Sequence, residues 1–157
     1  MYTFKDLNGY RVDLYFKQNT YIIEPRHILA IIKKGNRFLC TIHRKRGVEF
    51  PGGKVEQNET LEQAVKREVL EETGVEVQDI LPLGYYVVHD EPLFSKAFFY
   101  GEECAVVHDI FELETTGRIW LTEEEIFEQP LLSFYMKDEG MQRILQEVKQ
   151  LEQRRNL

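Results

Sequence analysis

The stretch that decides the fold reads GKVEQNETLEQAVKREVLEETGV and occupies residues 53–75. Thr60 and Gln63 have the spacing of a capping box, which marks the start of a helix. Gly74 follows Thr73, and a glycine directly after the last periodic residue is a good helix stop. The pattern therefore predicts a helix over residues 60–73, preceded by a loop that begins at the glycines.

One face of this predicted helix changes character along its length. At about 100° per residue, the first two turns present an apolar stripe, as a core-facing helix should: Leu61, Ala64 and Val65. The next members of the same stripe are all carboxylates: Glu68, Glu71 and Glu72. Carboxylates on a half-buried face repel one another, so a cation should compensate them unless their pKa values rise. Oxygen ligands favour Mg²⁺ or Mn²⁺ over zinc, whereas the plainer reading is a solvated acidic surface.

The spacing of this stretch also carries a family resemblance. It reads Gly53-x5-Glu59-x7-Arg67-Glu68-Val69-x-Glu71-Glu72-x-Gly74-Val75 and resembles the Nudix box at every defined position. At ~5–7% usage per residue type, such a match arises by chance on the order of once in a billion windows. The match covers 23 of 157 residues, so it indicates the family and leaves the substrate open.

The resemblance implies a fold and a chemistry. Nudix proteins are α/β/α sandwiches with a mixed sheet and a loop-helix-loop catalytic motif, and they hydrolyse a nucleoside diphosphate linked to another group. Mg²⁺ would be the cofactor, with Mn²⁺ able to substitute. Glu71 and Glu72 would be metal ligands, and Glu68 a further ligand or the base that activates water. A backbone carbonyl at Gly52 or Gly53 would also face the metal.

Three further residues take roles from the resemblance. Glu59 and Arg67 would pair to orient the loop, which is a structural role. Some Nudix enzymes add an acidic ligand from a later loop, a few residues before an aromatic-containing strand. Glu114 has that placement and is favoured, with Glu112 as the rival and a surface-loop glutamate as the alternative.

The substrate is indicated less sharply. Residues 49–56, EFPGGKVE, are similar to the loop of the MutT group, which converts nucleoside triphosphates to monophosphate and pyrophosphate. A looser likeness to YtkD-type nucleoside triphosphatases also covers residues 4–6, 47–56 and 133–138. Together they favour purine (deoxy)nucleoside triphosphates, 8-oxo-dGTP among them. The alternatives are ADP-ribose or another nucleoside diphosphate derivative, the 5′ end of RNA, and an inactive domain that senses a nucleotide.

Side chains around the loop are candidates for substrate contacts. Cations could hold the phosphates, although a basic solvated turn is an equally ordinary reading; they are His43, Arg44, Arg46 and Lys54. Aromatic residues could stack on the base, although core packing is the commoner role; they are Phe50, Tyr86, Phe134 and Tyr135. Trp120 is assigned to the core.

The composition of the whole chain bears on its partners and its location. The formal net charge of -7 argues against a long polynucleotide partner but not against a small nucleotide, because a bound metal can supply positive charge locally. No apolar run approaches the ~20 residues that span a bilayer, and no signal-peptide pattern precedes the first strand. Cys40 and Cys104 are expected to be reduced and buried in strands. A cytoplasmic enzyme without a membrane partner is expected.

We expect one domain over residues 1–157. Turn residues at 34–36 and 89–92 predict two hairpins, and Pro51 with adjacent glycines predicts a turn without regular structure over 49–53. The remaining predicted elements are strands over 28–33, 37–43, 75–88, 93–107 and 117–121, a helical turn over 123–128, and a terminal helix over 137–154.

Overall fold

A mixed β-sheet forms the middle of the protein, and the computed structural model describes residues 1–16, 20–102, 104–111 and 114–155. The strands are β1 (Tyr2–Lys5), β2 (Arg11–Phe16), β3 (His27–Lys34), β4 (Arg37–His43), β5 (Gly47–Glu49), β6 (Gly52–Lys54), β7 (Val75–Val77), β8 (Ile80–Val88), β9 (Phe94–Gly101), β10 (Cys104–Val106) and β11 (Thr115–Leu121). The helices are α1 (Leu61–Thr73), α2 (Glu123–Phe127), the 3-10 turn η1 (Phe134–Met136) and α3 (Glu139–Arg155).

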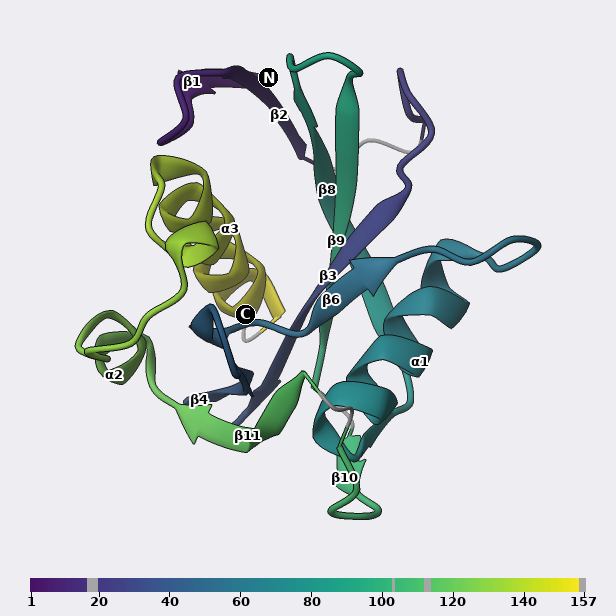
Figure 1. Ribbon diagram of the computed structural model, residues 1–157, viewed down its shortest axis with the longest axis vertical. Coiled ribbons are helices and arrows are strands. Elements are labelled where there is room, and N and C mark those ends of the chain that lie inside the picture. Colours follow the sequence, from purple (N-terminus) through teal and green to yellow (C-terminus); the bar gives the residue numbers. More distant parts are fainter. Residues whose placement is uncertain (17–19, 103, 112–113, 156–157) are drawn as a thin grey trace.

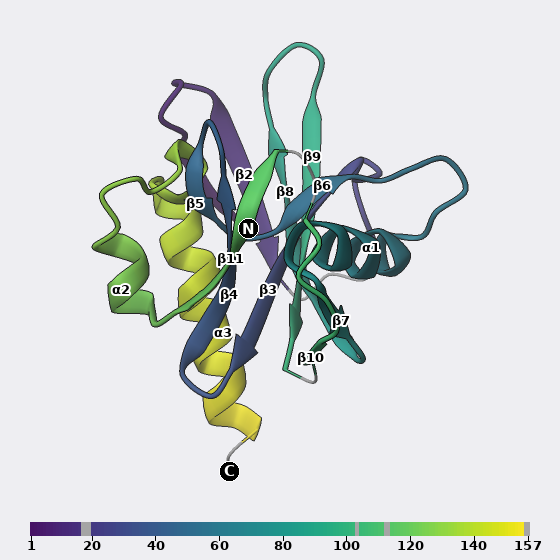
Figure 2. The same cartoon turned by 60° about the horizontal axis from the view of Figure 1, so that its bottom comes forward.

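The strand order of this sheet is β1-β2-β8-β9-β3-β4-β11, with β5 paired to β4 and β6 paired to β3. The β3–β9 pair is parallel, whereas β8–β9 and β4–β11 are antiparallel. Helix α1 lies against one face of the sheet and α3 against the other (Figures 1 and 2). The predicted α/β/α sandwich with a mixed sheet is confirmed.

Two apolar cores occupy the two faces of the sheet. The core on the α3 side includes Phe38 and Cys40 of β4 together with Ile144 of α3. The core on the α1 side includes Leu39 of β4 together with Val65 of α1. Side chains alternate between the two faces of a strand. The odd-numbered positions of β4 therefore face α1, and His43, at the end of β4, belongs to that set.

Helix α1 forms as its sequence predicts. The Thr60 hydroxyl accepts a hydrogen bond from the backbone N–H of Gln63, and the Gln63 side chain accepts one from the backbone N–H of Thr60, so the capping box is confirmed. Gly74 ends the helix with φ of 70°, the left-handed conformation that glycine adopts without strain. Val69 is fully buried between the glutamates of the motif, and its apolar side chain anchors the acidic half of the helix to the sheet.

Several sequence predictions need correction. Residues 49–53 are not free of regular structure, because Gly52 and Gly53 pair with β3. A Cβ on Gly52 would lie 2.5 Å from the carbonyl oxygen of Ile28, so the glycine permits the close approach rather than preventing a strand. The predicted strands over 75–88 and 93–107 each divide in two: β8 pairs with β9 in the main sheet, and β7 pairs with β10 in a separate ribbon.

The first strand of the chain contacts the start of the last helix. The β1–β2 hairpin has no counterpart in the sequence prediction, yet it extends the sheet next to β8. The hydroxyl of Tyr2 donates to Glu139 at 2.5 Å, and the guanidinium of Arg143 lies 4.4 Å from the centre of the Tyr2 ring. Strand β1 is thus held against the first turns of α3.

The structure bears on the expectations for the cysteines and for membrane-spanning segments. Cys40 and Cys104 are free thiols in strands, Cys40 buried and Cys104 half-buried, and burial raises the pKa of Cys40 to about 12. In the part of the chain that the structure describes, no helix is long and apolar enough to cross a membrane.

Candidate active site

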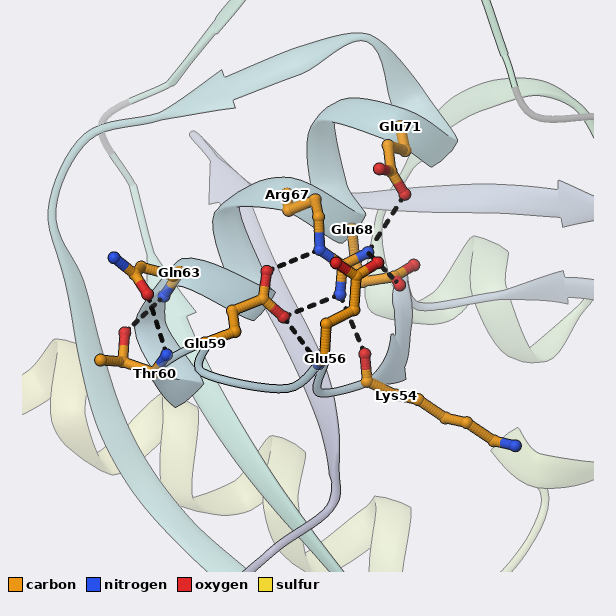
Figure 3. Close-up of polar contacts among 8 residues, drawn as sticks. All are labelled: Lys54, Glu56, Glu59, Thr60, Gln63, Arg67, Glu68 and Glu71. Carbon is orange, nitrogen blue, oxygen red and sulfur yellow. Dashed lines mark hydrogen bonds and ion pairs between the residues drawn. The ribbon is translucent and has the colours of Figure 1, made fainter.

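Arg67 is the centre of the polar network at the start of α1 (Figure 3). Its guanidinium binds the carboxylate of Glu59 through Nε at 2.6 Å and Nη2 at 2.9 Å, and Nη2 also donates to the backbone oxygen of Lys54 at 2.9 Å. The hydrogen bond to Glu59 raises the pKa of Arg67 and, in return, lowers the pKa of Glu59. Both groups stay charged, and the loop between β6 and α1 is fixed to the helix.

The same guanidinium also contacts the acidic stripe. Its Nη1 donates to Glu68 at 2.7 Å and to Glu71 at 3.2 Å. Glu72 extends toward β6 instead, where its carboxylate accepts from the backbone N–H of Gly52 at 3.3 Å. Glu68 and Glu71 are thus held by Arg67, and Glu72 is held by the backbone of β6.

Glu68 is the most buried of these carboxylates, with 9% of its surface exposed. A Cβ on Gly53 would lie 2.6 Å from its carboxyl carbon, so the absence of a side chain at Gly53 creates the space that Glu68 occupies. The glycine pair thus serves two separate contacts. Gly52 approaches the backbone of β3, and Gly53 approaches the Glu68 carboxylate.

The donor set suits a hard divalent cation. Four carboxylates, those of Glu56, Glu59, Glu68 and Glu71, lie within 3.5 Å of one guanidinium. Glu72 adds a fifth beside Gly52, so the cluster carries an excess of negative charge. The donors are oxygens, which Mg²⁺ and Mn²⁺ prefer. Within the described ranges, no group of three or more ligand side chains is already gathered around one point. Arg67 donates to both Glu68 and Glu71, and a bound metal would compete for these carboxylates.

The candidate phosphate-binding cations differ in their surroundings. Arg46 lines a cleft beside the glycines. The side chain of Lys54 points away from the glutamates of the stripe (Figure 3). Arg44 lies in the turn after β4, where its backbone N–H donates to the backbone oxygen of Glu114 at 2.8 Å. His43 is 7% exposed and faces the α1 side of the sheet.

The cleft has a volume of about 640 Å³ and lies on the α3 side of the sheet. Its wall combines the β1–β2 hairpin, β8, β9 and the chain between η1 and α3, and Gly52 and Gly53 lie at its edge. Phe134 and Tyr135 are 46% and 59% exposed at this cleft. Phe50 also lines it but is buried against Phe38 with ring centres 5.7 Å apart. The exposed pair is therefore better placed to stack on a ligand.

Sequence reasoning missed three polar residues of this cleft. Lys96 of β9 lies 6.0 Å from the centre of the Tyr135 ring. His27 of β3 is neutral at pH 7, because burial and then the charges of Lys96 and Lys54 lower its pKa to about 4. Glu49 is buried and binds both Arg46, at 2.7 Å, and the hydroxyl of Ser133, at 2.7 Å. Lys96 and His27 belong to no local motif, because strand pairing brings them to the cleft. Glu49 begins the stretch 49–56, but its contact with Ser133 joins residues 84 positions apart.

Glu114, the favoured late acidic ligand, and Trp120, assigned to the core, are both among the described residues. Glu114 is described, and one of its carboxylate oxygens lies 3.7 Å from Nε2 of His43. Its rival Glu112 lies outside the described residues. Trp120 is partly buried against the core on the α1 side, in the position expected of it.

Comparisons with known proteins match almost the whole chain. The family model described as NUDIX domain matches residues 24–142. YtkD of Bacillus subtilis (strain 168), which carries a provisional 8-oxo-dGTP diphosphatase name, is 35% identical over 153 residues, covering 96% of this chain and 97% of the relative. The crystal structure of the Bacillus subtilis pyrophosphohydrolase BsRppH superposes with a TM-score of 0.86 at 34% identity, covering 96% and 97%.

A shorter stretch of the chain is similar to a protein named for a different substrate. The NAD-capped RNA hydrolase NudC of Pasteurella multocida (strain Pm70) is 40% identical over 68 residues, which are 41% of this chain and 26% of that protein.

Proposed function

The chain belongs to the NUDIX domain family, and we propose on this basis that it hydrolyses nucleoside 5′-triphosphates to the monophosphate and pyrophosphate. The observation that carries the proposal is the position of the cleft. It ends at Gly52 and Gly53, directly beside the carboxylates of Glu68 and Glu72. A nucleotide bound with its phosphate chain at the glycines would have its base among the aromatic side chains of the cleft.

Mg²⁺ would be held by Glu68, Glu71 and Glu72, with the backbone oxygen of Gly53 and the carboxylate of Glu114, and Mn²⁺ would substitute. When bound, the ion supplies charge neutralisation on the phosphoryl oxygens and a water of lowered pKa. The residues of the chain position these parts. Arg67 fixes the loop through Glu59, and Glu68 either binds the ion or accepts the proton of the attacking water.

The cleft supplies the complementary charge for the substrate. Arg46 is held in place by Glu49 and lies 5.7 Å from the centre of the Tyr135 ring, with Lys96 on the same ring. Two cations beside an exposed aromatic side chain suit an anionic ligand that carries a flat base. We propose purine nucleotides, 8-oxo-dGTP among them, as the preferred substrates, and the cytoplasm as the location of the reaction.

Product analysis in ¹⁸O-labelled water tests the reaction. Anchored phosphates leave an inner phosphorus open to water, and we expect attack at the β-phosphorus, which places the label in pyrophosphate. Label in the monophosphate would indicate attack at the α-phosphorus. Release of inorganic phosphate with nucleoside diphosphate would contradict the proposed reaction, although not the family assignment.

A second candidate substrate is the 5′-triphosphate end of RNA. The exposed rings of Phe134 and Tyr135 could stack on a base beyond the first nucleotide, as single-stranded RNA is commonly held. BsRppH, a pyrophosphohydrolase, matches over nearly the whole chain. The net charge of -7 argues against long contacts with a polynucleotide backbone.

A competition between substrates separates these candidates. The panel contains nucleoside triphosphates, ADP-ribose and a 5′-triphosphorylated oligoribonucleotide, each assayed for kcat/KM with Mg²⁺. We expect a nucleoside triphosphate to lead. If the RNA or ADP-ribose exceeds every nucleoside triphosphate by a hundredfold, about 2.7 kcal/mol in transition-state binding, the proposed substrate is wrong.

A further inference from the structure

His43 is held in one orientation at the end of β4. Its Nδ1 accepts two backbone hydrogen bonds from the following turn, from Lys45 at 3.1 Å and from Arg46 at 3.0 Å. A neutral imidazole that accepts at Nδ1 carries its proton on Nε2. The turn therefore fixes both the ring plane and the tautomer, and His43 presents an Nε2–H donor to the α1 side of the sheet.

This donor is buried and has no hydrogen-bond partner among the residues that the structure describes. A buried polar group without a partner is costly, so such a group in a folded protein needs an explanation. The carboxylate of Glu114 lies 3.7 Å from Nε2. The side chain of Glu114 is 80% exposed, so a small rotation brings it into hydrogen-bond range.

Glu114 is tied to the region that carries the box glutamates. Its backbone oxygen accepts from Arg44 at 2.8 Å, which fixes its main chain beside the turn after β4. Further along β11, Nη1 of Arg118 donates to the backbone oxygen of Thr73 at 2.9 Å, at the end of α1 directly after Glu72. The turn with His43, the start of β11 and the acidic end of α1 are thus connected on one side of the sheet.

We propose that His43 is a positioning residue, whose Nε2–H donates to Glu114 and directs that carboxylate toward the glutamates of α1. In this arrangement Glu114 reaches the divalent cation as the late oxygen ligand, and His43 removes the rotational freedom that an exposed glutamate would otherwise lose on binding. The inference rests on the proposed metal-dependent function. It gives His43 a role other than the direct phosphate contact that the sequence suggests.

Two substitutions separate the two nitrogens of the ring. His43→Asn keeps an acceptor near the place of Nδ1 and loses the donor at Nε2. His43→Gln places an amide donor near the position of Nε2 and loses the acceptor for the turn. His108→Asn is the matched control, because its Nδ1 also accepts a backbone N–H, from Ile110 at 3.2 Å.

Mn²⁺ binding, followed by the electron paramagnetic resonance signal of the free ion, needs no substrate. We expect His43→Asn to weaken binding by about 10- to 100-fold, as loss of a residue that supports a ligand commonly does. His43→Gln should keep most of the affinity while lowering the melting temperature, and His108→Asn should bind as the wild type. If His43→Gln binds as weakly as His43→Asn, or His43→Asn binds normally, the positioning role is wrong.

A double substitution tests the coupling directly. If His43 acts through Glu114, His43→Asn should add no loss of Mn²⁺ affinity in a Glu114→Gln background. Effects that multiply would overturn the proposal. In the unmodified protein, long-range ¹⁵N NMR of the imidazole should show the Nε2–H tautomer, and an Nδ1–H tautomer would overturn it even if the variants do not fold.

These measurements are separable from the test of the proposed function. A protein that binds Mn²⁺ with the expected coupling but hydrolyses no nucleotide would refute the proposed function and leave the role of His43 standing. Nucleotide hydrolysis with no coupling between His43 and Glu114 would refute the role of His43 and leave the proposed function standing. A wild-type protein that binds no Mn²⁺ would refute both.

Discussion

Alanine substitutions at the two adjacent glycines of β6 should affect different properties: Gly53→Ala the activity and Gly52→Ala the stability. At Gly53 a new Cβ would lie 2.6 Å from the carboxyl carbon of Glu68, whereas ordinary contact begins at 3.4 Å. The carboxylate must therefore move by about 0.8 Å, the difference of these two distances. It is the end of a flexible side chain, so it can move without disturbing the sheet.

The magnitudes follow from this displacement. A shift near 1 Å in a positioned catalytic group costs about 100-fold in rate, so Gly53→Ala should lower kcat by about that factor. Its stability should change by less than about 1 kcal/mol, because replacing glycine also reduces the entropy of the unfolded chain. At Gly52 the Cβ would lie 2.5 Å from the carbonyl oxygen of Ile28, a backbone atom. Gly52→Ala should therefore destabilise the fold by about 2 kcal/mol.

The assay pairs steady-state kinetics in saturating Mg²⁺ with urea denaturation of both variants. Gly53→Ala keeps its backbone oxygen, so a loss of activity would report on Glu68 rather than on a missing carbonyl ligand. The reasoning is refuted if Gly53→Ala retains full kcat, or if it loses as much stability as Gly52→Ala does.

Three other predictions concern the same cluster. Glu72→Gln keeps the shape of the side chain but loses its charge, so kcat should fall by several orders of magnitude with an unchanged melting temperature; near-normal kcat in saturating metal would show that the ligands are assigned wrongly. Arg67→Ala should lower stability by about 3 kcal/mol. Because Arg67 lowers the pKa of Glu59, the pair stabilises the fold above pH ~4.5. In acid denaturation, the difference in unfolding free energy between Arg67→Ala and wild type should therefore shrink as pH falls through the lowered pKa of Glu59. Activity should vanish with EDTA and return with Mg²⁺ or Mn²⁺, whereas restoration by zinc alone would contradict the oxygen-ligand assignment.

The predictable part of the fold is the part with local causes. Helix α1 was predictable because its cap, apolar stripe and glycine stop all lie within residues 60–74, and the capping box has the predicted form. The hairpin between β3 and β4 was predictable for the same reason. The assignment of 49–53 failed because glycine usually signals a turn, whereas Gly52 here allows a strand to approach Ile28.

The candidate site divides in the same way. The box glutamates share a helix face, so their grouping follows from the helical period alone. Lys96 and His27 reach the cleft through the parallel pairing of β3 with β9, which no short pattern encodes. Glu49 becomes a structural centre through Ser133, which is 84 positions away in the chain. The orientation of His43 depends on which face of β4 meets α1, and that requires the complete sheet.

The contact between Tyr2 and Glu139 implies an order of assembly during synthesis. These residues are 137 positions apart, and Phe4 and Ile144, from the same two elements, both line the cleft. The loop and helix that carry the box glutamates are translated long before α3, whereas the cleft wall cannot close until α3 has left the ribosome. The loop and helix with the box glutamates can thus acquire local structure first, and the cleft is completed only after α3 has been translated.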